Sequence, residues 1–432
     1  MSTSTPRPFV SRSLALVLAF LTLALAWPAM ATAAEVETEA EAPDKLFPFA
    51  PTVRCELGQS IAHALQIRRF FRQVTIKFTG ACDEDLVIAR DRVTLRGDSP
   101  DATILGLIDV FGGSNITFED FTVLGEISDP IDTGRGAINV ENGGAITLNN
   151  IHIQTQNVRG VRVINSTASL NDVTMDDILV GGFVFRASNL TISGDIVATR
   201  CVFGMTLVDS NAIARNANFT LDDNFFAGMI IQINSGFEHV EGVLSANNNP
   251  FGILLASNAV YAHGSFLEIS GATTAGILID ELSSITPLGG APGGGPGITV
   301  TDNPGDGIVV DRFSTLETFA ATVTGNATGL LADNSEVRLA GATIESNATD
   351  VSLAFGTKLV TNGEDNVIGS PIVCDASVLT RGALSCGAAP AAAQAVSSRS
   401  AVVDLSNAEL RAALPESTFL GLMGSRLKRH ER

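Results

Sequence analysis

A repeat of about 23 residues constrains this chain more than any other feature of its sequence. From about residue 93 to 360, a short apolar stretch is followed by a turn rich in Asn, Asp and Gly, and then by a glycine with three or four mostly apolar residues. Successive glycines of this kind lie 24, 22, 22, 24, 24, 24, 31 and 22 residues apart. They are Gly136, Gly160, Gly182, Gly204, Gly228, Gly252, Gly276, Gly307 and Gly329. A recurring period of this size is typical of stacked repeat architectures.

The period and the residue types together predict an all-β solenoid. Each unit is too short for two packed helices and is dense in Val, Ile, Thr and Phe, which favour strands. Two or three strands per unit make one coil, which pairs with the next coil about 4.8 Å along the axis. No coil buries its own apolar face, but a stack of coils does. The stretch from Val74 to Leu359 predicts about 12 to 13 coils with one continuous core.

The segments before the repeats carry a family resemblance. They are Val53-Arg-Cys55, Gly58–Leu65, Val74–Gly80, Cys82 and Arg90–Gly97. Together with the repeats to about residue 370, they resemble the right-handed parallel β-helix superfamily, which has the pectate-lyase-like fold. The resemblance implies right-handed coiling. It also implies a polysaccharide-acting enzyme as one function, either a lyase with a calcium-holding Asp cluster and an Arg base or a hydrolase with Asn-Thr-Asp, Asp-Asp, His-Gly and Arg-Ile-Lys blocks.

The N-terminus predicts export. Arg7 and Arg12 precede the apolar run Leu14–Ala26, and Ala31-Thr-Ala33 offers a signal-peptidase site, so residues 1–33 are predicted to be a cleaved signal peptide. The run is shorter than the roughly 20 residues that span a bilayer, and no later run is longer, so no transmembrane segment is expected in the mature chain. We expect a periplasmic or extracellular protein, with an acidic leader over residues 34–50.

The β-helix with its N-terminal cap is predicted over residues 51–387. Helical spacing of apolar residues within Ser60–Phe71 predicts a capping helix over the first coil. Residues 388–432 read as an Ala-rich linker and a tail, with a short helix after the capping box Ser406–Glu409. The basic end, Arg426–Arg432, is interpreted as solvated, with contact to a polyanion as the alternative.

The five cysteines fit an exported chain. Outside the cytoplasm thiols tend to oxidise, and the pairing Cys55–Cys82 and Cys374–Cys386 places one disulfide at each end of the repeats. Cys201 is left over and is predicted to be a small buried apolar residue. No spacing of Cys and His supports a zinc site, so no metal or other cofactor is expected, with calcium arising only in the lyase alternative.

One candidate catalytic group lies in a repeated turn. The pairs Asp176-Asp177 and Asp222-Asp223 precede successive glycine-led segments, and Arg200 lies between them. Two carboxylates are what glycoside hydrolysis needs, so Asp177, Arg200 and Asp223 are candidates, arranged as a ladder along the stack. The same turn holds Asn, Gly or Ser in other coils, which favours a backbone-turn role with charges balanced along the stack.

Two insertions interrupt the repeat. Ile127–Gly136 contains the second group of candidates, Asp129, Asp132 and Arg135, on the rim of the solenoid. Leu288–Gly297 is rich in Gly and poor in charge, so it is interpreted as a flexible loop.

A third cluster holds the only Tyr and two of the five His. It comprises Glu238, His239, Glu241, Tyr261, His263 and Glu268. A His beside a Glu could act as a general base. The two His are predicted to be out of register by one residue and therefore to point to opposite faces of the sheet.

Alternation along the glycine-led strands also predicts an outward-facing apolar column, Val184, Thr206, Ile230, Leu254, Leu278, Val309 and Leu331. Exposed, it would form a long apolar stripe, so we expect it to be covered by the C-terminal helix or by a second copy of the rod through self-association.

The composition narrows the function. A formal net charge of −19 argues against nucleic-acid binding. The only Trp, Trp27, lies in the predicted signal peptide, which leaves few of the aromatic residues that commonly stack on sugars. The sequence therefore favours a non-catalytic interaction rod that binds a glycan or an envelope component, with a polysaccharide lyase or glycosidase as the alternative.

Overall fold

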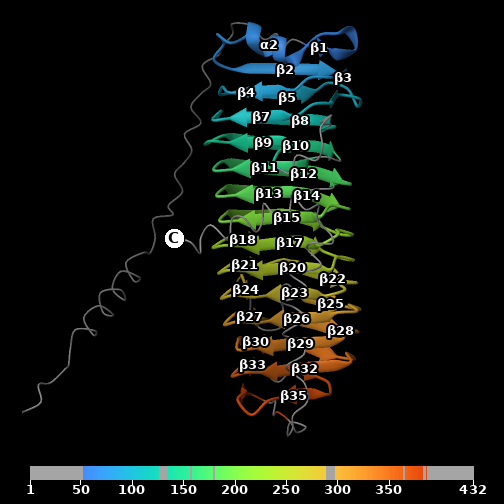
Figure 1. The fold of residues 1–432 in the computed structure, drawn as a ribbon, viewed down its shortest axis with the longest axis vertical. Coiled ribbons are helices and arrows are strands. Elements are labelled where there is room, and N and C mark those ends of the chain that lie inside the picture. Colours follow the sequence, from blue (N-terminus) through green and yellow to red (C-terminus); the bar gives the residue numbers. More distant parts are fainter. Residues whose placement is uncertain are drawn as a thin grey trace, which may run out of the picture. The chain divides into compact units, whose positions relative to one another are not determined.

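The computed structural model describes residues 52–125, 134–155, 158–178, 181–288, 297–362, 365–382 and 386. Over these ranges the chain forms stacked parallel coils, which run from blue to red in Figure 1. The predicted signal peptide, acidic leader, Ala-rich linker and C-terminal tail lie outside the described residues. Within the described ranges, no helix is long and apolar enough to cross a bilayer.

Each coil contributes one strand to a 13-stranded parallel sheet, here called sheet 1. Its strands are β4 (Leu86–Ile88), β7 (Ile108–Phe111), β9 (Gly136–Glu141), β11 (Arg159–Ile164), β13 (Phe183–Arg186), β15 (Phe203–Val208), β17 (Ala227–Gln232), β20 (Phe251–Ala256), β23 (Ala275–Ile279), β26 (Asp306–Val310), β29 (Thr328–Asp333), β32 (Thr349–Ala354) and β35 (Ile372–Cys374). Thirteen coils confirm the number that the repeat predicts.

The other strands form a 23-stranded parallel sheet, here called sheet 2, which has two ladders. One ladder contains β1 (Thr52–Arg54), β2 (Val74–Thr79), β5 (Val93–Gly97), β8 (Ile116–Val123), β10 (Ala145–Gln154), β12 (Thr167–Asp176), β14 (Asn189–Thr199), β16 (Asn211–Thr220), β18 (Gly236–His239), β21 (Val260–His263), β24 (Ser284–Pro287), β27 (Thr315–Thr318), β30 (Glu336–Ala340), β33 (Lys358–Asn362) and β36 (Leu379–Arg381). The second contains β3 (Ala81–Cys82), β6 (Thr103–Ile104), β19 (Val243–Ser245), β22 (Phe266–Ser270), β25 (Ile298–Thr301), β28 (Ala321–Thr324), β31 (Thr343–Glu345) and β34 (Val367–Ile368). The long strands β8 to β16 join the two ladders.

The interior is one apolar core that runs through the whole stack, from Val53 to Cys374. Side chains alternate along each strand, so that in β13 Phe183 and Phe185 are buried while Val184 between them faces outward. This is the parallel β-helix architecture that the resemblance implies, and that prediction is confirmed.

The glycine that opens each repeat has a packing role. A β-carbon added at Gly182 would lie 2.6 Å from the carbonyl oxygen of Gly204 in the next coil, and one added at Gly204 would lie 2.5 Å from that of Gly228. Only a residue without a side chain allows neighbouring coils to approach this closely. The register differs in the first coil after the insertion, where Ala137 rather than Gly136 stacks on Gly160.

Turn residues with positive φ form a second column. Asp177, Arg200 and Asp223 have φ of 60°, 54° and 57°. In later coils the same column contains Asn248, Gly271, Asp302, Gly325 and Ser346, all with positive φ. These residue types tolerate the left-handed conformation, which supports the backbone-turn interpretation of the column.

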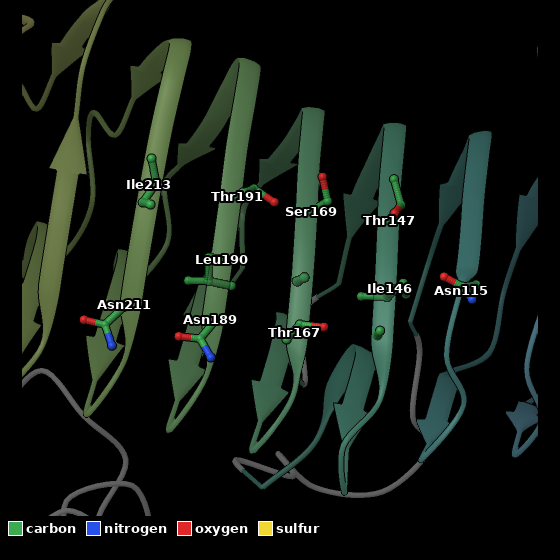
Figure 2. A pocket seen from close by; sticks show the side chains of 12 residues that line it. Asn115, Ile146, Thr147, Thr167, Ser169, Asn189, Leu190, Thr191, Asn211 and Ile213 are labelled. Atoms are coloured by element: carbon green, nitrogen blue, oxygen red, sulfur yellow. The ribbon is translucent and has the colours of Figure 1, made fainter. Parts of the chain in front are cut away.

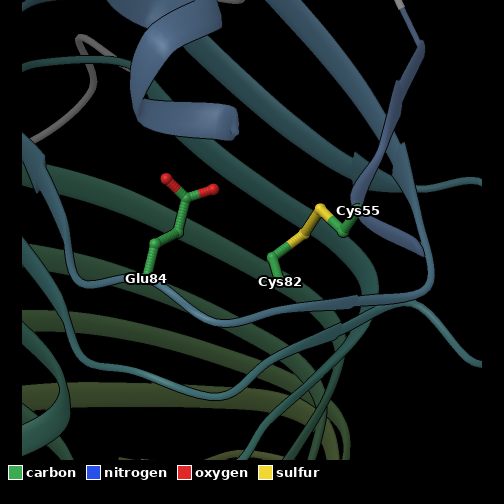
Figure 3. A group of neighbouring side chains, drawn as sticks. All are labelled: Cys55, Cys82 and Glu84. Carbon is green, nitrogen blue, oxygen red and sulfur yellow. A yellow bond between two sulfur atoms is a disulfide. The ribbon is translucent and has the colours of Figure 1, made fainter. Parts of the chain in front are cut away.

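The first coil is capped as predicted. Helix α2 (Ile61–Ile67), preceded by the 3-10 turn η1 (Cys55–Leu57), begins after Ser60, whose hydroxyl accepts a hydrogen bond from the His63 amide. Glu84 accepts further bonds from the Ser60 hydroxyl and the Ile61 amide. Figure 3 shows Glu84 below the helix, with its carboxylate directed toward the helix and the disulfide to one side.

The predicted disulfides Cys55–Cys82 and Cys374–Cys386 are both present. With both sulfurs of the first bridge bonded to each other, Cys55, Cys82 and Glu84 do not form a thiolate metal site, although they lie together. Cys201 is free and buried, and burial raises the pKa of its thiol to about 12. A thiol with this pKa stays protonated, as a packing residue would.

Candidate functional site

The structure has an open groove of about 420 Å³ on the outer face of sheet 2. It crosses five successive strands, from the start of β8 to β16 (Figure 2). The lining residues are Asn115, Ala145, Ile146, Thr147, Thr167, Ala168, Ser169, Asn189, Leu190, Thr191, Asn211 and Ile213. None of these side chains ionises near neutral pH, so the groove is polar but uncharged.

Strand register arranges the polar side chains of the groove in columns. Thr167, Asn189 and Asn211 lie opposite one another on β12, β14 and β16. A second column contains Ser169 on β12 and Thr191 on β14. Because neighbouring strands are about 4.8 Å apart, each column presents hydroxyl or amide groups at a regular spacing. Figure 2 shows equivalent side chains on neighbouring strands.

Apolar side chains border the polar columns of the groove. Ile213 on β16 is 38% exposed, and Ala145 on β10 is partly exposed. Ile146, Ala168 and Leu190 are only 3–4% exposed and belong to the interior core.

The polar groups of the groove remain available. Among the described residues, no hydrogen bond is made by the side chains of Thr167, Asn189 or Thr191. The groove thus combines free hydrogen-bonding groups with an exposed apolar side chain, a combination that ligand sites commonly have.

These groove residues were missed as candidates at the sequence level. Their signal was present, because Thr167, Asn189 and Asn211 follow one another at the local period of 22 residues. Polar residues of this kind are also ordinary on a solvated strand face. The sequence did not distinguish a groove from a flat exposed surface.

A charged cluster lies on the outer face of sheet 1, where the chain returns from the first insertion. Arg135 donates from Nη2 to Oδ2 of Asp109 over 2.7 Å, and Asn139 donates from Nδ2 to the other Asp109 oxygen over 2.8 Å. The Arg162 guanidinium donates to Glu141. The Arg135 side chain is 39% exposed, whereas Asp109 is 15% exposed. The contact with Asp109 therefore holds the Arg135 guanidinium in place, while the rest of the Arg135 side chain is exposed to solvent.

The other two candidates of this group, Asp129 and Asp132, lie outside the described residues. Asp109 and Asn139 were missed as partners of Arg135. Asp109 stacks on Asn139 across 30 residues, because the insertion lengthens this coil. The regular period therefore gave no indication that they meet.

The predicted ladder of Asp177, Arg200 and Asp223 is not formed. The Arg200 guanidinium instead pairs with Asp176, which also accepts a hydrogen bond from the Thr199 hydroxyl. Asp223 accepts from Asn248 Nδ2 over 3.0 Å. Asp177, Arg200 and Asp223 are all exposed. The register brings them into one column, because Thr199 lies opposite Asp176 and Arg200 follows it. The Arg200 side chain nevertheless leaves its left-handed turn toward Asp176.

The prediction that His239 and His263 face opposite sides was wrong. They stack directly on each other in β18 and β21, because the local period is 24 residues, the same as their separation. Both are fully buried in the solenoid interior beside Tyr261 and Ser265. A general base needs access to its substrate, so this cluster has the environment of a core feature.

Inside the core, His239 has partners on both ring nitrogens. Its Nδ1 lies 2.6 Å from the Ser265 hydroxyl, and its Nε2 lies 2.9 Å from the carbonyl oxygen of Ala217. Burial lowers the pKa of His239 to about 4, although its backbone hydrogen bonds partly oppose this shift. Burial likewise lowers the pKa of His263, whose Nε2 has no hydrogen-bond partner among the residues that the structure describes.

Comparisons with known proteins found solved structures only. No family model matches the chain, and no curated protein matches it. The A-module of mannuronan C-5 epimerase AlgE6 from Azotobacter vinelandii is similar with a TM-score of 0.42 at 16% identity, over 75% of this chain and 95% of that one. The AlgE4 A-module from the same organism has a TM-score of 0.32 at 15% identity, over 74% and 86%.

A third similar structure is the Agl-KA catalytic domain, with a TM-score of 0.34 at 12% identity, over 78% of this chain and 69% of that one. Likenesses at these scores carry no information about activity. The parallel β-helix fold of this chain rests on its own strand register, which pairs thirteen successive coils in parallel.

Proposed function

We propose that this protein is an exported, non-catalytic rod that binds a neutral polysaccharide in the groove of sheet 2. The observation that carries the proposal is the uncharged groove itself, with unpaired hydroxyl and amide groups repeated on successive strands beside the exposed apolar side chain of Ile213. A neutral polysaccharide repeats hydroxyl groups along its length and also has apolar ring faces. A carboxylate or cation would find no charged partner among the lining residues.

Export is supported by the sequence pattern of residues 1–33 and by two disulfides, which persist in oxidising compartments. A periplasmic or extracellular rod would meet polysaccharides of the envelope or the surroundings. The groove contains no group that would act as a general acid or base, which is why binding rather than turnover is proposed for it.

The variant Asn189→Leu with Thr191→Val should weaken binding of a soluble neutral glucan or galactan by roughly 10- to 100-fold, because each lost neutral hydrogen bond contributes about 1 kcal/mol. Affinity electrophoresis against a panel of soluble polysaccharides would measure the change. Thr299→Val with Thr322→Val is the matched control, since these exposed threonines lie opposite each other on β25 and β28, outside the groove. Equal retardation of both variants and the wild type would contradict the proposed groove, and so would binding confined to polyuronates.

The second candidate function is a polysaccharide lyase or glycosidase. One observation favours it: Arg135 is held by Asp109 and partly exposed, and it belongs to the same insertion as Asp129 and Asp132. An arginine base in a lyase, with calcium on nearby carboxylates, would use residues of this kind.

We expect the wild type to release neither unsaturated nor reducing ends from neutral or uronate polysaccharides, with or without calcium. Ultraviolet absorbance and reducing-end assays after long incubation would check this. If the wild type forms product and Arg135→Lys does not, the protein is a lyase or glycosidase rather than a binding rod, and Arg135 locates its site. If Arg135→Lys still forms product but Asp177→Asn or Asp223→Asn does not, the activity belongs to the turn column instead.

A further inference from the structure

The N-terminal cap has a second apolar surface, which faces away from the core. Helix α2 closes the first coil with the buried side chains of Ile61 and Leu65. Ile67 ends the helix, and Phe70 and Phe71 follow it, yet these three residues are 61%, 83% and 51% exposed. Phe70 is the most exposed of the large apolar residues that the structure describes. Figure 1 shows α2 at the N-terminal end of the stack, so this surface belongs to the end of the solenoid rather than to its sheets.

Hydrogen bonds hold the exposed segment in a defined conformation. The Phe71 amide donates to the Arg68 carbonyl oxygen over 3.0 Å. Arg90, which follows β4, donates from its guanidinium to the carbonyl oxygens of Arg68 and Phe71. A partner that binds this segment therefore does not have to order the chain, which is one of the main free-energy costs of binding.

Arginine side chains accompany the exposed phenyl rings. The Arg69 guanidinium lies 4.7 Å from the centre of the Phe70 ring, which is within the range of a cation–π contact. Arg69 and Arg72 are exposed, and in the part of the chain that the structure describes neither forms an ion pair with a carboxylate. Residues 61–73 contain no Asp or Glu, although the whole chain has a formal net charge of −19. The result is a basic and aromatic surface, here called the cap patch, which consists of Ile67, Arg69, Phe70, Phe71 and Arg72.

An anionic phospholipid bilayer matches both properties of the cap patch. The negative surface of such a bilayer attracts exposed arginines. Its headgroup region also accepts phenyl rings, which are thereby removed from water. A soluble polyanion would pair with Arg69 and Arg72 but would leave Phe70 in water. A neutral bilayer would accept Phe70 but would not pair with the arginines.

The charge of the rest of the chain restricts where such a bilayer can bind. Because the chain as a whole is acidic, an anionic surface repels it except where basic side chains are concentrated. We propose that the cap patch binds the surface of an anionic phospholipid bilayer, with Phe70 and Phe71 among the headgroups and Arg69 and Arg72 against the phosphates. The groove of sheet 2 shares no residue with the cap patch, so one surface can be occupied independently of the other.

Vesicle binding tests the proposal. The exported chain, which is predicted to begin at residue 34, is titrated with vesicles of phosphatidylglycerol and phosphatidylcholine, and binding is measured by co-sedimentation. Arg69→Gln with Arg72→Gln should weaken binding roughly 30-fold, because two arginines near the surface no longer contribute. Arg186→Gln with Arg215→Gln is the matched control, since these arginines are exposed on β13 and β16, and this variant should bind like the wild type.

Loss of the apolar contact is a separate test. Phe70→Ser with Phe71→Ser should weaken binding to the same vesicles roughly tenfold or more, because two phenyl rings no longer leave water. The substituted side chains are exposed in the free protein, so each variant should unfold at the urea concentration of the wild type. Unfolding measurements thus distinguish lost binding from lost folding.

A tryptophan reporter locates the contact without removing it. Trp27 is the only Trp of the sequence and precedes residue 34, so Phe70→Trp places a single indole on the cap patch. Its fluorescence should shift to shorter wavelength when anionic vesicles are added, because the ring enters the interfacial region of the bilayer. Phe225→Trp is the matched control, at a position 56% exposed between β16 and β17, and its emission should not change.

The proposal is overturned if the wild type does not bind anionic vesicles, if both double variants of the cap patch bind as the wild type does, or if the Phe70→Trp emission does not shift. Equal binding to vesicles of phosphatidylcholine alone would overturn it as well, because charge would then have no role. Binding to polyphosphate that is as tight as vesicle binding and unaffected by Phe70→Ser with Phe71→Ser would replace the bilayer with a soluble polyanion.

Discussion

The variant Gly252→Ala is expected to destabilise the solenoid by about 2–3 kcal/mol, which is the cost of overpacking a tightly packed core position. The added methyl carbon would lie 2.5 Å from the carbonyl oxygen of Gly276 and 2.5 Å from Cγ2 of Ile269. The oxygen belongs to the backbone of the next coil, so it can move only if the ladder between β20 and β23 distorts. The backbone of Gly252 is not in the left-handed region, so the effect is purely steric.

Urea unfolding would measure the loss, and hydrogen exchange would place it in β20 and its neighbours. Gly297→Ala is the matched control, because its added carbon would lie 3.6 Å from the nearest atom, the Ala320 carbonyl oxygen. That variant should be neutral or slightly stabilising, since alanine restricts the unfolded chain. If the two variants unfold at the same urea concentration, close approach of the coils does not explain the repeated glycine.

Acidification is expected to destabilise the protein through His239 by about 3 kcal/mol. The pKa of this buried histidine is lowered from 6.5 to about 4 in the folded chain. The unfolded chain therefore binds a proton that the folded chain excludes. The contribution of His239 is complete above pH 6.5, falls as the pH decreases, and is lost once the pH passes below 4.

His239→Phe would isolate this contribution, because a phenyl ring retains the contacts with Phe219 and Phe237 without titrating. Unfolding free energies measured between pH 7 and 4 should fall less steeply in this variant than in the wild type. Phe183→Leu, which alters the buried core in an earlier coil without removing a titrating group, is the control and should keep the wild-type slope. Parallel slopes for the wild type and His239→Phe would mean that His239 is not neutral in the folded chain.

The fold was predictable because its determinants are local and repeated. Each glycine-led segment begins with a glycine at which neighbouring coils approach closely, as at Gly252 and Gly276, and continues with alternating buried apolar residues. A period of 22 to 24 residues then determines which residues stack on one another. The capping helix was predictable from the spacing of Ile61 and Leu65, and the disulfides were predictable from the ends of the repeat.

The candidate site was less predictable, because it depends on details that a period does not contain. Arg200 was expected to bridge Asp177 and Asp223, yet the partner of its guanidinium depends on side-chain direction at a left-handed turn, and that partner is Asp176. Correct alignment of His239 with His263 required the local repeat period of 24 residues rather than the average period of about 23. The groove depends on surface shape, which polar residues such as Asn189 do not reveal in sequence.

The strand register has a consequence for how such a chain can change length. Thr167, Asn189 and Asn211 occupy the same position in consecutive coils, so the stretch between any two of them is a complete unit of the architecture. Duplication or loss of one such unit would preserve every pairing on either side and lengthen or shorten the molecule by a single step of about 4.8 Å. Evolution can therefore change the length of the solenoid one coil at a time. The length of its binding surface can change in this way without any change in the packing of its interior.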